Sequence, residues 1–135
     1  MQAHVLRLPP GSDLRAALDA CYASLAAQQG VTAACVVAVV GSLSQAVLRY
    51  AGAPGGTLLA GPLELLTLSG TLSADGAHLH ATVADAQGQV RGGHAMPGCV
   101  VRTTAELVLA LLPGWQFTRV ADASTGFQEL VATRL

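Results

Sequence analysis

The segment from position 77 to 96 constrains the fold most, because it reads as two strands joined by a specific turn. Apolar and polar residues alternate in Ala77–Ala84 and, less strictly, in Gln89–Met96, as expected of strands with one buried face. Between them, Asp85-Ala86-Gln87-Gly88 has aspartate first and glycine where a left-handed residue is needed. This pattern favours a tight loop with a bulge at Gly88, in which Asp85 pairs with Gln89.

Three of the four histidines fall in this predicted hairpin. His78 and His80 are two residues apart on a strand, so both rings project from one face while Leu79 points to the other. Counting back from the turn places His80 opposite His94, with the two Cβ atoms roughly 5 Å apart. The sequence therefore predicts that three imidazoles converge on one side of the sheet.

Three imidazoles on one face are a ligand set for zinc or a similar divalent ion, with a further position left for water or a small ligand. Gly92 and Gly93 precede His94 and leave space where a ligand or a neighbouring chain can approach closely. We therefore interpret His78, His80 and His94 as a metal site. The alternative is that these histidines only decorate a solvent-facing surface, which strand alternation alone would also produce.

Other side chains are weaker candidates. His4 stands alone near the start of the sequence and is interpreted as a strand or surface residue. Glu64, Glu106 and Glu129 each lie in an apolar stretch, where a carboxylate is either a general base with a raised pKa or an ion-pair partner between subunits.

Cysteine usage argues against a disulfide framework. Cys21, Cys35 and Cys99 are odd in number, far apart and in apolar company, so buried thiols are expected. Cys99 follows the hairpin closely and is an alternative fourth metal ligand.

One helix is predicted between Ser12 and Gly30. Ser12 can accept hydrogen bonds from the first turn, and Gly30 is typical of a residue that ends a helix. The apolar residues between them recur at three- and four-residue steps: Leu14, Ala17, Leu18, Cys21, Tyr22 and Leu25.

The remaining elements are predicted as strands. Ala33–Val40 is an uninterrupted apolar run, which favours a central strand covered on both faces. Val101–Leu112 is compatible with helix or strand and is assigned as strand because of its threonines and valines. The chain is therefore predicted to be α+β, a largely antiparallel sheet with one clear amphipathic helix. The other predicted strands are Leu63–Leu72, Gln116–Val120 and Glu129–Thr133.

Composition limits the function classes. The 135 residues, 52% of them apolar and 11% charged, predict a single domain spanning 1–135 with its own core. A formal net charge of −1 without any basic run provides no footprint for nucleic acid. The small number of polar side chains is not enough to cover the surface of a small monomer. We therefore expect subunit contacts to bury part of the apolar surface.

Two further absences bear on location. No apolar run reaches the roughly 18 residues of a membrane span. The first residues, MQAHVLRLPPG, lack the basic start and long apolar middle of a secretory signal. A cytoplasmic protein without a membrane partner is therefore expected.

Four segments carry a resemblance to a known family: GPLELLTLSGTL (61–72), HLHATVADAQGQVRGGH (78–94), TTAELVL (103–109) and TGFQEL (125–130). They resemble the plant and prokaryote conserved domain, called PPC or DUF296, in its stand-alone prokaryotic type. The resemblance implies a homotrimer of α+β subunits built around an antiparallel sheet, with partner binding or self-association as its role.

The resemblance also bears on the histidines. Prokaryotic members of this family are similar in keeping histidines at the positions of His78, His80 and His94. The implied fold is similar to that of acetolactate decarboxylase, a zinc enzyme whose metal is held by a comparable His-x-His pair and a later histidine. This likeness favours a metal and leaves the substrate open.

Two departures from the plant members affect partners. Plant members accompany AT-hook motifs, whose Arg-Gly-Arg-Pro core enters the DNA minor groove, and no such sequence occurs here. Bacterial and archaeal relatives are often described as DNA-binding. The partner-recruiting loop of the plant domain reads Gly-Arg-Phe-Glu-Ile-Leu, whereas Pro62 and Leu63 replace its arginine and phenylalanine here.

Three functions follow from these observations. The first is a trimeric binding and assembly module whose histidines form a divalent-metal or small-ligand site, or stabilise the assembly. The second is a metal-dependent enzyme in which a carboxylate such as Glu64 or Glu106 moves protons. The third is direct DNA binding by the seven arginines dispersed over three subunits.

Overall fold

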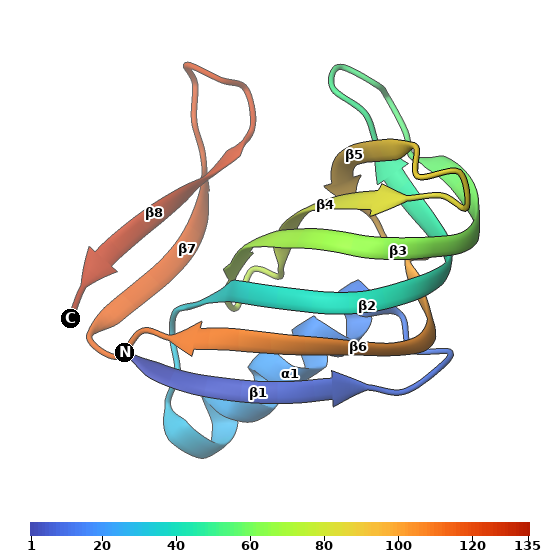
Figure 1. Ribbon diagram of the computed structural model, residues 1–135. Coiled ribbons are helices and arrows are strands. Elements are labelled where there is room, and N and C mark those ends of the chain that lie inside the picture. The colour runs from blue at the N-terminus through green and yellow to red at the C-terminus, as the bar shows by residue number, and fades with distance from the viewer.

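The computed structural model describes residues 1–135 and contains one helix and eight strands. A six-stranded antiparallel sheet carries the helix on one face, and a separate two-stranded sheet stands beside it (Figure 1). This arrangement confirms the α+β class. The elements are β1 (Gln2–Leu8), α1 (Leu14–Gln29), β2 (Ala34–Arg49), β3 (Thr57–Leu72), β4 (His78–Ala84), β5 (Val90–Ala95), β6 (Val100–Leu111), β7 (Trp115–Ala121) and β8 (Gln128–Arg134).

The large sheet has the strand order β1-β6-β2-β3-β4-β5, and it curls back on itself. The end of β2 also pairs with β5, through Leu48 opposite Ala95 and Arg49 opposite His94. Strands β2, β3, β4 and β5 therefore form a closed loop of pairings at one end of the molecule. The sequence did not predict that β2 and β5 pair, since the two strands are about 40 residues apart in the chain.

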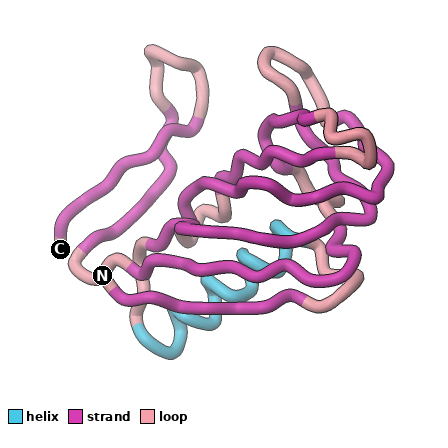
Figure 2. Tube along the Cα trace, in the orientation of Figure 1, coloured by secondary structure: helices cyan, strands magenta, loops and turns pink.

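Helix α1 lies against one face of this sheet (Figure 2), and the buried residues of the helix and the sheet form one hydrophobic core. The helix buries a single stripe made of Leu14, Leu18, Tyr22 and Leu25, as its three- and four-residue spacing predicts. No helix is both long and apolar enough to cross a lipid bilayer.

The start of α1 differs from the prediction by one residue. Asp13, rather than Ser12, is the N-cap, and its carboxylate accepts a hydrogen bond from the backbone N–H of Ala16 at 2.9 Å. The second carboxylate oxygen accepts from the N–H of Gly98 at 2.6 Å, which ties the helix to the loop before β6. The Ser12 hydroxyl instead donates to the carbonyl of Pro9 at 2.8 Å. Gly30 ends the helix in the left-handed conformation, with φ of 67°, as predicted.

The apolar run that begins β2 lies at the centre of the sheet, but the prediction that both its faces are covered is wrong for the single chain. Val37 and Val40 are 61% and 69% exposed. They lie on the sheet face that α1 does not cover, which we call the outer face. Uniform valine composition cannot distinguish a two-sided core strand from a strand whose outer side meets another subunit.

The hairpin of β7 and β8 forms its own two-stranded sheet and confirms the two predicted closing strands. Two hydrogen bonds donated by Arg119 attach it to the main body. Its guanidinium donates to the hydroxyl of Thr71 on β3 at 2.9 Å, and its backbone N–H donates to the carboxylate of Asp75 at 2.7 Å. Strand β1 pairs along its length with β6. From the sequence, only His4 in this segment was interpreted, as a strand or surface residue.

All three cysteines are free thiols. Cys99 is buried as predicted, but Cys21 and Cys35 are only half-buried. Cys21 lies beside the buried stripe of α1 rather than within it, so the expectation of three buried thiols is wrong for these two.

Replacing Asp13 with alanine should destabilise the fold by about 1–2 kcal/mol, because the helix loses its N-cap acceptor and the N–H of Gly98 loses its partner. Chemical denaturation followed by circular dichroism measures this change. The matched control is Ser12→Ala, which removes only an exposed local bond and should cost clearly less. A larger loss from Ser12→Ala than from Asp13→Ala would contradict the assignment of the cap.

Candidate metal centre

The turn between β4 and β5 has the predicted geometry. The backbone N–H of Asp85 donates to the carbonyl of Gln89 at 3.0 Å, and Gly88 has a φ of 76°. One oxygen of the Asp85 carboxylate accepts the N–H groups of Gln87 and Gln89, each at 2.9 Å. With this turn in place, His80 lies opposite His94, which confirms the predicted register.

Alternation along β4 fixes the direction in which the histidines point. Leu79, Ala81 and Val83 are 0%, 3% and 1% exposed and belong to the core. His78 and His80 therefore project from the outer face. A slip of one residue would bury the imidazoles and expose the leucine and valine, so hydrophobic burial specifies the orientation of the site.

The three imidazole rings meet as a compact cluster. The ring centroids are 5.2 Å apart for His78 and His80, 5.0 Å for His78 and His94, and 5.8 Å for His80 and His94. One nitrogen of each ring lies within 4.8 Å of the others, and no aspartate, glutamate or cysteine joins the group. Zinc binds imidazole nitrogen at about 2.0–2.1 Å, so small side-chain rotations would bring all three nitrogens to one ion.

Electrostatics keeps two of these histidines in the form that binds metals. Burial lowers the pKa of His94 to about 4, with smaller contributions from the charge of Arg49 and from His78 when it is protonated. Burial and the charge of Arg119 also lower the pKa of His78, although the carboxylate of Glu129 opposes this shift. At neutral pH both imidazoles are therefore uncharged, and each has a lone pair free for a cation.

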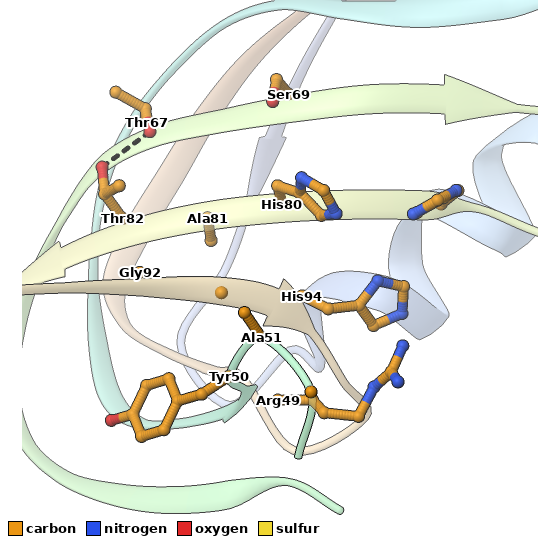
Figure 3. A pocket seen from close by; sticks show the side chains of 13 residues that line it. Arg49, Tyr50, Ala51, Thr67, Ser69, His80, Ala81, Thr82, Gly92 and His94 are labelled. Atoms are coloured by element: carbon orange, nitrogen blue, oxygen red, sulfur yellow. Dashed lines mark hydrogen bonds between the residues drawn. The ribbon is translucent and has the colours of Figure 1, made fainter. Parts of the chain in front are cut away.

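A row of residues runs across four strands at the level of the cluster. Register places Ser69 opposite His80, His80 opposite His94, and His94 opposite Arg49. Cross-strand neighbours project from the same face, so all four side chains are directed to the outer face. Figure 3 shows the guanidinium group of Arg49 beside the ring of His94.

Two hollows flank the histidines. The first has a volume of about 480 Å³ and is bounded by β2, β3, β4 and β5, with Thr67 and Thr82 hydrogen-bonded at its rim at 2.6 Å (Figure 3). The second, of about 490 Å³, lies between His78, His94 and the start of β8, and it includes Arg119. Few apolar side chains line either one, which favours a small polar ligand.

Sequence reasoning missed Arg49 and Arg119. Arg49 reaches the site only because β2 pairs with β5. Arg119 reaches it only because the β7–β8 hairpin lies against β3, where Arg119 bonds to Thr71. Neither long-range contact has a local signal in the sequence. A search for arginines at the last position of a long strand would have found Arg49 and would have missed Arg119.

The glycine pair serves strand packing. A Cβ atom at Gly93 would lie 2.7 Å from the carbonyl oxygen of Arg49, and one at Gly92 would lie 3.0 Å from a methyl carbon of Thr82. Gly93 therefore lets β5 approach β2, which brings Arg49 beside His94. The close approach at Gly93 is thus made by another strand of the same chain. Gly92 and Gly93 also line the first hollow, so the expectation that they leave space for a ligand stays a prediction.

The other predicted ligands lie outside the cluster. His4 is on β1 opposite Leu109, at the far edge of the sheet. Cys99 is buried, and its thiol lies 3.5 Å from the carbonyl of Val47, to which it donates. Since it is absent from the group of potential ligands, its alternative role as a fourth ligand is wrong for this conformation.

The three glutamates separate into two groups. Glu64 and Glu106 are exposed on the outer face and line neither hollow. Glu64 is opposite Ala84, four residues and roughly 13 Å along β4 from His80. Glu129 lies at the start of β8 and lines the second hollow with His78. Of the three, only Glu129 is placed to act at the histidines.

Comparison with known proteins agrees with this fold. A hypothetical protein from Salmonella cholerae-suis has a solved structure with a TM-score of 0.91 and 41% identity, covering 98% of this chain and 94% of that one. The metal-containing protein AF0104 from Archaeoglobus fulgidus has a TM-score of 0.79 and 27% identity, covering 97% and 94%.

A sequence relative is much longer than this chain. The bifunctional protein GlmU of Synechococcus sp. (strain JA-2-3B'a(2-13)) is 52% identical over 130 residues. The match covers 96% of this chain and 20% of that protein, so the chain spans about a fifth of the relative's length.

The sequence profile of the Plants and Prokaryotes Conserved (PCC) domain matches residues 1–113. This range contains the whole six-stranded sheet, the helix and all three clustered histidines. The chain therefore belongs to the Plants and Prokaryotes Conserved domain family.

Proposed function

We propose that this chain is a trimeric binding and assembly module in which His78, His80 and His94 hold one divalent metal, zinc or a similar ion. The observation that carries the proposal is the convergence of three imidazole nitrogens within 4.8 Å on one face of a rigid sheet. Three neutral nitrogen ligands leave at least one coordination position open. The histidines line two hollows with few apolar side chains, which would give a small ligand room to reach a metal held there.

A family relationship supports the metal. The protein from Archaeoglobus fulgidus that shares this fold is metal-containing and 27% identical. Oxygen-preferring ions such as magnesium and calcium are disfavoured, because no carboxylate joins the cluster. Imidazole nitrogen suits zinc, copper, iron or nickel.

The outer face of the sheet supports self-association. Val5, Val40 and Leu66 are 71%, 69% and 46% exposed there, and exposed apolar side chains of this kind can pack in a subunit interface. A homotrimer is the assembly that the family resemblance implies. We propose that the outer face of β1, β6, β2 and β3 supplies apolar contacts in it.

A metal-dependent enzyme is the second candidate, favoured by the position of Glu129. This carboxylate and the imidazole of His78 line the same hollow. A metal held by the histidines would supply Lewis-acid chemistry at a carbonyl or water. Glu129 is then placed to hold or move a proton in the same hollow, the role that the sequence had suggested for Glu64 or Glu106.

Zinc should bind to the purified, tag-free protein at one equivalent per chain, measured by elemental analysis after dialysis and by titration calorimetry. His78→Ala and His94→Ala should each weaken zinc by more than about 100-fold, since loss of outer-shell partners alone costs 10–100-fold. His4→Ala is the matched control, because His4 lies on β1 at the far edge of the sheet. Unchanged zinc affinity in both cluster variants would exclude the site.

The metal-free protein should lose stability as the pH falls from about 6.5 towards 4. The depressed pKa of His94, near 4, means that the unfolded chain takes up a proton before the folded one does. The contribution of His94 to stability is complete at pH values above its pKa in the unfolded chain, and it declines as the pH falls below that pKa. His94→Gln should flatten the pH profile of the thermal midpoint. An equally steep profile in the variant would show that His94 titrates normally.

DNA binding, the third candidate, is the one that the net charge of −1 disfavours most. A short duplex should show no more than background binding, with little change in affinity between 50 and 200 mM salt, because a phosphate-contacting interface would give a steep slope. Fluorescence anisotropy measures this. If the logarithm of the binding constant instead fell linearly with the logarithm of the salt concentration, with a slope of several released counterions, the DNA-binding alternative would be supported.

A further inference from the structure

Arginine side chains surround the histidine cluster. Arg15 on α1, Arg49 at the end of β2 and Arg119 on β7 all line the hollow that contains His78 and His94. They come from three elements that are far apart in the sequence. Nearly half of the seven arginines in a chain of net charge −1 therefore gather at one place.

Two of these arginines have no carboxylate partner. The single ion pair in the structure joins Arg15 to Asp19 at 3.9 Å. Arg49 is half-buried and makes no side-chain hydrogen bond, and the guanidinium of Arg119 donates only to the hydroxyl of Thr71. A guanidinium has five N–H donors, so most of the hydrogen-bonding capacity at this site is unused.

The nearby acidic groups do not neutralise these cations directly. Asp75 and Glu129 line the same hollow, but neither forms an ion pair within 4 Å of an arginine. The carboxylate of Asp75 instead accepts the backbone N–H of Arg119. With Arg15 paired to Asp19, two arginines and two carboxylates remain in the hollow, and the guanidinium groups of Arg49 and Arg119 are the ones without an ion-pair partner.

A metal would add positive charge beside the unpaired guanidinium groups of Arg49 and Arg119. Three neutral imidazoles neutralise none of the charge of a divalent ion, and Arg49 lies opposite one of the ligands in the strand register. Positive charges so close together repel one another in a partly buried site. An anion that contacts both the metal and the guanidinium groups would remove this repulsion, and charge-assisted bonds from arginine to carboxylate or phosphate are strong and frequently bidentate.

We infer that the ligand of this site is a small organic oxyanion, with its carboxylate or phosphate group bound by Arg49 and Arg119 and a further oxygen at the open position of the metal. This inference rests on the proposed metal function only for the contact between the ligand oxygen and the metal. The contacts with Arg49 and Arg119 do not depend on the metal. The two hollows, of about 480 and 490 Å³, are within the usual range for small-ligand sites.

Titration calorimetry with defined probes tests this inference. Malonate and inorganic phosphate are titrated into zinc-loaded protein, and malonamide serves as the uncharged probe of similar shape. At least one of the two anions should bind while malonamide does not. Tighter binding of malonate would identify a carboxylate ligand, and tighter binding of phosphate would identify a phosphate ligand.

Arg49→Gln should weaken the preferred anion by about tenfold or more, the loss expected for a charge-assisted hydrogen bond. Its zinc affinity should be no weaker than that of the unaltered protein, because the substitution removes a positive charge beside the metal ligands. The variant should fold normally, because the Arg49 side chain makes no hydrogen bond in the structure, and Arg119→Gln provides a second measurement. Arg102→Gln is the matched control, since Arg102 is exposed on β6 and lines neither hollow.

The same titrations on metal-free protein separate the two proposals. If the protein binds zinc but neither anion, the inference is overturned and the metal site stays intact. The same conclusion follows if the anion binds equally well to Arg49→Gln and to the unaltered protein. Anion binding that depends on Arg49 in a protein that takes up no zinc would overturn the metal function and retain the arginine contact.

Discussion

The pairing of His80 with His94 depends on the short turn between β4 and β5. Asp85 closes that turn with its backbone and its carboxylate, and Gly88 supplies the left-handed residue that the loop requires. A shift by one residue would move the third imidazole to the opposite face. The geometry of the histidine cluster is therefore determined by a local bond network at least four residues away from the rings.

The core and the site are two consequences of one alternation. Leu79, Ala81 and Val83 are driven inward by burial of their apolar surface, and this burial directs His78 and His80 outward. The stability of the sheet therefore also orients the histidines. The sheet therefore fixes the direction in which each histidine leaves the backbone, while rotation of the side chains still adjusts the positions of the rings.

The sequence predicted the features that are set by local chemistry. The hairpin, its register, the helix stripe and the cluster of three histidines depend on residues near one another in the chain, and each was confirmed. Contacts between distant segments were not predictable in this way. The pairing of β2 with β5 brings Arg49 to the site, and the position of the last hairpin brings Arg119 and Glu129.

The incorrect predictions have physical explanations too. Ser12 and Asp13 are both good N-cap residues, and Asp13 was selected because its second oxygen also reaches Gly98. The valines of β2 are apolar on both sides, although only one side meets the core of the single chain. Gly93 is required where two strands approach closely, a constraint that becomes visible only when the sheet is complete.

X-ray absorption at the zinc edge of the loaded protein tests the central claim most directly, because it reports the type and distance of the atoms bound to the ion. Coordination by three imidazoles of His78, His80 and His94 predicts nitrogen neighbours at about 2.0–2.1 Å with the scattering pattern of histidine rings, together with a light atom at the open position. Sulfur at about 2.3 Å, or a shell without imidazole scattering, would contradict it.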